Sequence, residues 1–139
     1  MALNIYETAT PTSAFSTESS FSNPIANSFD GSLGAIVEKK YYVRNDDADR
    51  SYSVITVQPI DSGDDLVDGS SGFSWKLYAG DIQPVSAQWE TITAGAAISL
   101  SNITGDTTYL PFWVRMIVPA NSEVNSYQSV VLRLSYTET

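Results

Sequence analysis

Acidic side chains are the most concentrated chemical groups in this sequence. Seven aspartates fall between positions 46 and 68. Asn45, Asp47 and Asp49 alternate as the first oxygen ligands of a calcium-binding loop do. The pattern then fails, because Arg50 stands where such a loop needs glycine and Thr56 where it needs a bidentate glutamate. We therefore expect residues 45–49 to form a turn between two strands.

A second acidic segment follows at residues 61–68. Its carboxylates could wrap a hard cation such as calcium, or they could form a solvated loop that adds only solubility. We favour the solvated loop, and the sequence leaves a metal ion open as the alternative. The residues concerned are Asp61, Asp64, Asp65 and Asp68.

The residues that most often carry catalysis are missing. The chain has neither histidine nor cysteine, which excludes Ser-His-Asp and Cys-His enzymes, thiol chemistry and cysteine-bound zinc. A glycosidase would need two carboxyl groups flanking one sugar subsite. The candidates Glu38, Glu90 and Glu123 are instead spread along the chain. We expect a protein that is not an enzyme and that uses no cofactor.

For two of the three tryptophans, the alternation of apolar residues along the strand predicts which side of the sheet the side chain faces. Trp75 is in phase with Phe73 and Leu77, so it is predicted to lie in the core. Trp113 is out of phase with its apolar neighbours and must face the other side of its strand. An outward tryptophan is covered by the N-terminal arm, by a partner chain or by a ligand.

Composition narrows the possible partners. The 139 residues carry 7 Lys+Arg and 16 Asp+Glu, a formal net charge of -9. Such a chain repels phosphate backbones and anionic bilayers, so we expect neither nucleic acid nor membrane as a partner. Residues 1–10 hold no basic or apolar segment typical of a secretory signal, and no apolar run approaches the roughly 20 residues of a membrane span.

The elements that must position these residues are strands. From residue 31 onward, β-branched and aromatic runs alternate with turn signals, and no window predicts an amphipathic helix. This pattern predicts an all-β antiparallel sandwich over residues 31–139, Ig-like or jelly-roll. The expected strands are 35–44, 52–57, 73–78, 97–100, 109–118 and 127–136, with a short piece near 89–92. The side chains expected inward include Val37, Tyr41, Val43, Phe112, Val114, Met116, Val118, Val130, Leu132, Leu134 and Tyr136.

Residues 1–30 differ from the rest of the chain. They are dense in Ser, Thr, Ala and Pro, contain no Lys or Arg, and show neither helical nor strand periodicity. We predict an extended N-terminal arm that docks through its spaced aromatic residues, on its own domain or on a neighbouring chain. The expected interface residues are Phe15, Phe21 and Phe29 of the arm together with Trp113.

Three short segments of the sequence resemble segments of small sandwich-fold virion proteins of tailed bacteriophages. They are Tyr-Tyr-Val-Arg-Asn-Asp-Asp at 41–47, Gly-Phe-Ser-Trp-Lys-Leu at 72–77 and Leu-Pro-Phe-Trp-Val-Arg at 110–115, followed by Val-Pro-Ala at 118–120. The resemblance covers roughly residues 29–137 and leaves out the arm. It brings no catalytic residues with it.

The resemblance implies a structural protein located in the virion. We expect a capsid decoration (cement) subunit that stabilises the particle by contacts with the major capsid protein or other virion proteins, as a homo-oligomer and most simply a trimer. Two alternatives stay open. One is a tail or baseplate component. The other is a carbohydrate-binding or adhesion module that stacks sugar on Trp113, Tyr42 and Tyr78.

Overall fold

The computed structural model describes residues 3–6, 16–17, 35–60, 73–105, 109–118 and 131–138. Within these ranges the chain forms short and medium strands and one short helix. The elements are β1 (Leu3–Tyr6), β2 (Ser16–Thr17), β3 (Ala35–Asn45), β4 (Ser51–Ile60), β5 (Ser74–Ala79), α1 (Ser86–Glu90), β6 (Ile98–Leu100), β7 (Ile103–Thr104), β8 (Tyr109–Val118) and β9 (Val131–Glu138).

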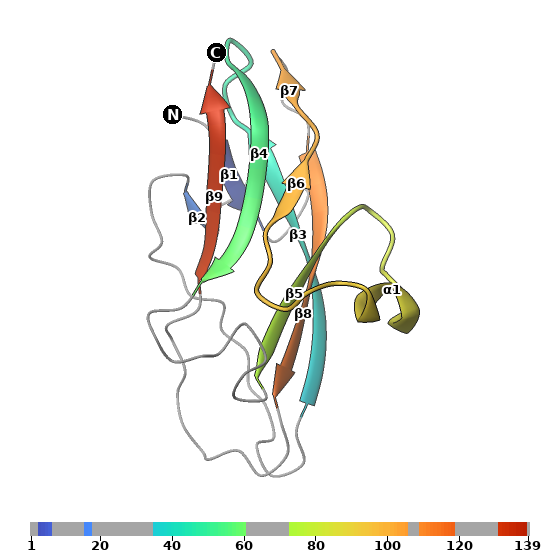
Figure 1. The fold of residues 1–139 in the computed structure, drawn as a ribbon. Coiled ribbons are helices and arrows are strands. Elements are labelled where there is room, and N and C mark those ends of the chain that lie inside the picture. The colour runs from blue at the N-terminus through green and yellow to red at the C-terminus, as the bar shows by residue number, and fades with distance from the viewer. Residues whose placement is uncertain are drawn as a thin grey trace.

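The strands form two antiparallel sheets. The five-stranded sheet has the order β2-β1-β3-β8-β5. The second sheet is centred on β4, which pairs with β9 along one edge and with β6 and β7 along the other. Figure 1 shows β4 and β9 in one layer, with β3 and β8 in the layer behind them. The predicted all-β antiparallel sandwich is therefore confirmed.

Alternate residues of the facing strands fill the space between the sheets. Tyr41 and Phe112, paired across β3 and β8, stack with their ring centroids 5.8 Å apart. Trp75 and Leu77 of β5 are buried in the same cluster, as their phase predicts. The predicted inward residues Val43, Val114, Met116, Leu132 and Leu134 are buried too, and Val37 and Tyr136 pack against the core from its margin. The side chains of Val118 and Val130 lie outside the described residues.

Part of the predicted arm belongs to this core. β1 is an inner strand of the five-stranded sheet, hydrogen-bonded to β2 on one side and β3 on the other. Leu3 and Ile5 have no exposed surface. Residues 3–6, within the predicted arm, therefore form a strand of the sandwich, which the sequence did not predict because four residues are too few to display the period of two that marks a strand. The boundary at residue 30 stays a prediction, since residues 18–34 lie outside the described part.

A one-turn helix replaces the short strand expected near residues 89–92. α1 begins after Pro84 and Val85, and the side-chain Oε1 of Gln88 accepts a hydrogen bond from the backbone N–H of Val85 at 2.9 Å. This contact satisfies a donor at the start of the helix. Trp89 is the buried residue of α1, with 1% of its surface exposed. Five residues provide too little periodicity to reveal such a helix in the sequence.

A β-bulge interrupts β4. Ser53 pairs with Thr137 and Thr56 with Ser135, so that two residues of β4 oppose one residue of β9. The first of these two, Val54, has a φ of 52° and is 70% exposed. The bulge resets the alternation, which allows both Tyr52 and Ile55 to point into the core. A β-branched residue in the left-handed region costs on the order of 1–3 kcal/mol.

Replacing Val54 by asparagine should stabilise the protein. Asparagine tolerates the left-handed region and Val54 has little packing to lose, so we expect Val54→Asn to raise the free energy of unfolding by about 0.5–1 kcal/mol. Urea denaturation of the variant and the wild type measures the difference. Ser53→Asn is the matched control, because it places the same side chain at an ordinary negative φ. A gain in both variants, or in neither, would contradict the strained bulge.

Candidate functional site

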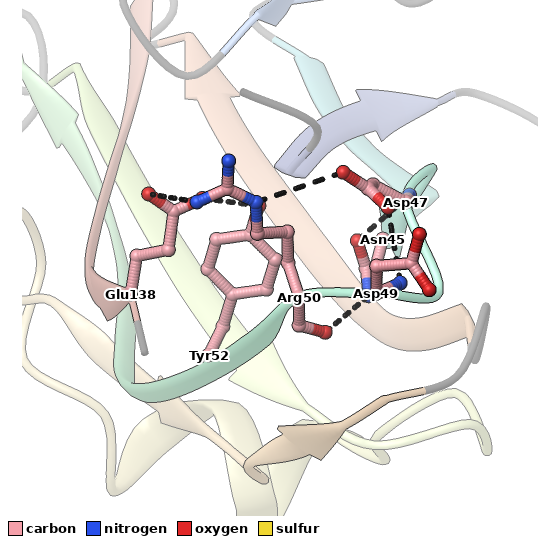
Figure 2. A network of polar contacts seen from close by, with 6 residues as sticks. All are labelled: Asn45, Asp47, Asp49, Arg50, Tyr52 and Glu138. Carbon is pink, nitrogen blue, oxygen red and sulfur yellow. Dashed lines mark hydrogen bonds and ion pairs between the residues drawn. The ribbon is translucent and has the colours of Figure 1, made fainter.

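The chain crosses from one sheet to the other at residues 45–50. Asn45 ends β3 and is completely buried. Its Oδ1 accepts a hydrogen bond from the backbone N–H of Asp47 at 3.0 Å, and its Nδ2 donates to the carbonyl oxygen of Arg50 at 3.1 Å. Asp47 Oδ1 in turn accepts from the backbone N–H of Asp49 at 3.0 Å. Figure 2 shows this network, which we call the corner (residues 45–50).

The corner explains the spacing that resembles a calcium loop. The side-chain oxygens of Asn45 and Asp47 turn toward backbone N–H groups, and these hydrogen bonds fold the predicted turn. Arg50 supplies the nearby positive charge, with its guanidinium 3.7 Å from Asp47 Oδ2 and 3.6 Å from Glu138 Oε2. In the part of the chain that the structure describes, no three acidic side chains cluster as metal ligands would. Residues 61–68 lie outside that part.

The corner also anchors strands from both sheets. Asp46 Oδ2 accepts hydrogen bonds from Asn4 Nδ2 at 2.7 Å and from the Tyr6 hydroxyl at 2.6 Å, which ties β1 to the end of β3. Burial, and then the hydrogen bond to Asp46, raise the pKa of Tyr6 above its ordinary value of 10.0. On the other sheet, Arg50 of the corner pairs with Glu138 of β9, and Glu138 Oε1 also accepts a hydrogen bond from the Tyr52 hydroxyl at 3.0 Å. The corner is a structural junction.

The outward face of the five-stranded sheet carries a row of aromatic and cationic side chains. Trp113 of β8 pairs in register with Lys40 of β3 and with Tyr78 of β5. The Lys40 ammonium lies 5.3 Å from the ring centroid of Tyr42 and 5.9 Å from that of Trp113. The structure thus brings together the three residues proposed to stack sugar, Trp113, Tyr42 and Tyr78, each half-buried. The other expected interface residues, Phe15, Phe21 and Phe29, lie outside the described residues.

α1 packs on this outward face through Trp89. The indole Nε1 of Trp89 donates to Glu38 Oε1 at 2.6 Å, and Lys76 Nζ donates to the backbone oxygen of Trp89 at 3.1 Å. The Arg115 guanidinium lies 5.9 Å from its ring centroid. Glu38, one of the scattered carboxylates considered for sugar hydrolysis, therefore holds a helix in place. Glu90 is exposed on α1, and Glu123 lies outside the described residues.

The segment between β5 and α1 borders the same face, and we call it the β5–α1 loop (residues 80–85). The backbone oxygen of Asp81 accepts a hydrogen bond from Trp113 Nε1 at 3.2 Å, and the Asp81 carboxylate forms an ion pair with Lys40. The hydrogen bond to the Asp81 carboxylate is the main reason that the pKa of Lys40 is raised above its ordinary value. Two aliphatic residues of this loop point into solvent, Ile82 and Val85, with 82% and 63% of their surface exposed. Their exposure has no signal in the sequence, where both resemble ordinary core residues.

Comparison of the chain with protein-family models, with curated proteins and with solved structures finds no match. Among the described residues, no helix is long and apolar enough to cross a membrane. The site is therefore interpreted from its own chemistry.

Removing the buried amide at the corner should destabilise the whole sandwich. Asn45→Ala deletes one donor and one acceptor and leaves the Asp47 N–H and the Arg50 carbonyl without these partners, which we expect to cost about 2–3 kcal/mol. Thermal and urea denaturation measure the loss. The control is Asp49→Ala, which removes an exposed carboxylate of the same turn and should change the free energy by less than about 0.5 kcal/mol. Equal effects of the two variants would contradict the role assigned to Asn45.

Proposed function

We propose that this chain is a non-enzymatic structural protein of a bacteriophage particle, a capsid cement or decoration subunit that acts by contact with its neighbours. Its partners are the major capsid protein or other virion proteins, and further copies of itself in a homo-oligomer, most simply a trimer. The proposal for a phage particle rests on the resemblance of the three sequence segments. Most of their described residues fall on β3, β8 and β5, which are neighbouring strands of one sheet.

One observation supports the part of the proposal that this protein acts by binding neighbouring subunits. The β5–α1 loop displays Ile82 and Val85 in solvent while Trp113, Lys40 and α1 hold it in place. These two exposed aliphatic side chains offer a protein partner apolar surface to bury. The polar side chains nearby serve the fold instead, since Glu38 accepts from Trp89 and Asp81 pairs with Lys40. This division of roles supports a binding protein over a catalyst.

The arm belongs to the same proposal. Phe15, Phe21 and Phe29 are offered as anchors on neighbouring subunits, each contributing on the order of 1.5–3 kcal/mol when buried. Because Leu3 and Ile5 lie in the core, removing the whole arm would damage the sandwich. The arm is better tested by replacing these three phenylalanines with serine and leaving β1 intact.

The experiment asks where the protein resides. Antibodies raised against the purified chain are applied, with gold labels, to virions of the encoding phage after banding in a caesium chloride gradient. We expect regular labelling of the capsid surface, and we expect particles assembled with the triple serine variant to lose the protein. Labelling confined to the tail would favour the tail or baseplate alternative. Particles that lack the protein altogether would overturn the proposal.

A carbohydrate-binding module is the second candidate, because Trp113, Tyr42 and Tyr78 share one face. If sugar stacks there, oligosaccharide titration should change the tryptophan fluorescence, and Trp113→Ala should abolish binding while Trp113→Phe keeps most of it. The matched control is Trp75→Phe, a change within the core. Under the assembly proposal none of the sugars tested on a glycan array should bind. Saturable binding that Trp113→Ala removes would favour the second candidate.

A further inference from the structure

β5 is the last strand of the five-stranded sheet in the part of the chain that the structure describes, because it pairs with β8 on one side only. In an antiparallel pair, the backbone groups of alternate residues point toward the partner strand and away from it. The carbonyl oxygen of Trp75 points away from β8, since it accepts a hydrogen bond from the N–H of Gly95 at 2.8 Å. Leu77 and Ala79 alternate in phase with Trp75, so their backbone groups face the same free edge. Such an edge can pair with a strand of another chain.

Residues 91–97 cross this edge on their way from α1 to β6 of the other sheet, and we call them the edge guard (Figure 1). Gly95 is the contact residue of the guard. Its N–H donates to Trp75 of β5, and its carbonyl oxygen accepts from Gln58 Nε2 of β4 at 3.2 Å. Gly95 has a φ of 78°, in the left-handed region that glycine adopts without the steric cost of a side chain. One residue is thus hydrogen-bonded to both sheets.

The sequence of β5 is complementary to itself when two copies of the strand run antiparallel. Pairing centred on Leu77 places Leu77 opposite its own copy and Trp75 opposite Ala79. The same register places Lys76 opposite Tyr78, so that no two like charges meet and each ammonium comes within reach of a tyrosine ring. The strand that the free edge would accept is therefore β5 of a second copy, in a two-fold pair that closes on itself.

We propose that the edge guard blocks self-association through β5, because Gly95 occupies the carbonyl oxygen of Trp75 that a second copy of β5 would need. The guard is a built-in inhibitory contact: it ties β5 to the second sheet and keeps two five-stranded sheets from joining into one. This inference goes beyond the proposed function and does not depend on it. If the protein forms the homo-oligomer proposed above, its copies meet through a surface other than the edge of β5.

Sedimentation velocity of the full chain over a range of concentrations tests the guard. Gly95→Pro removes the donor to Trp75 and cannot adopt a positive φ, so we expect this variant to associate about tenfold or more tightly than the wild type. Near-ultraviolet circular dichroism checks that the variant is folded. Gly105→Pro is the matched control, because it also removes a glycine of positive φ and its N–H bond to Ser51 Oγ, at a turn of the other sheet. It should sediment like the wild type.

A second substitution separates pairing through β5 from general misfolding. The N–H of Ala79 faces the free edge, so Ala79→Pro keeps the pairing with β8 and blocks a new strand. Added to Gly95→Pro, it should restore the sedimentation of the wild type. If Gly95→Pro does not fold, Gln58→Met replaces it, since this change removes only the donor to the Gly95 carbonyl and should raise association less, again reversed by Ala79→Pro. A folded guard variant that sediments like the wild type, or association that Ala79→Pro leaves unchanged, would overturn the proposal.

Discussion

The buried side chain of Asn45 is the interaction on which the two-sheet arrangement depends. The chain must leave the five-stranded sheet after β3 and enter the other sheet at β4 within five residues. A turn this tight leaves buried backbone groups without backbone partners. The Asn45 side chain accepts from the backbone N–H of Asp47 and donates to the carbonyl oxygen of Arg50. The asparagine amide offers the two functions on separate atoms, a donating Nδ2 and an accepting Oδ1. A leucine of similar size would fill the space and leave the turn unpaired.

Around this crossing, charged groups stabilise structure and apolar groups remain for contact. Asp46, Arg50 and Glu138 connect strands of both sheets. Part of the negative charge at this end of the molecule is therefore held in hydrogen bonds and ion pairs within the fold. The outward face follows the same principle, since Glu38 and Lys76 hold Trp89 and thereby α1. What these contacts support is a loop with two aliphatic residues in solvent. The proposed contact function depends on this loop.

Much of the sandwich could be predicted, because the longer strands bury every second residue. The alternation in residues 109–118 and 73–78 identified Phe112, Val114 and Trp75 as core residues. The bulge at Val54 could not be predicted, since a register shift in β4 depends on pairing with β9, far away in the sequence. β1 and α1 are each too short to show a period. At the outward face, the phase of Trp113 indicated its direction, but its support of Asp81 depends on a loop that only tertiary packing positions.

The pairing of β4 with β9 has a consequence for how fast the protein folds. The hydrogen bond from Tyr52 to Glu138 joins residues 86 positions apart. The hydrogen bond from Tyr6 of β1 to Asp46, just after β3, joins residues 40 positions apart. Each of these contacts requires a long chain segment to close, at a cost in conformational entropy, before the hydrogen bond can form. All-β domains dominated by such distant pairs fold in milliseconds to seconds, far slower than helical bundles. During that interval the strands of both sheets expose unpaired edges, and such edges are the surfaces through which incompletely folded copies aggregate.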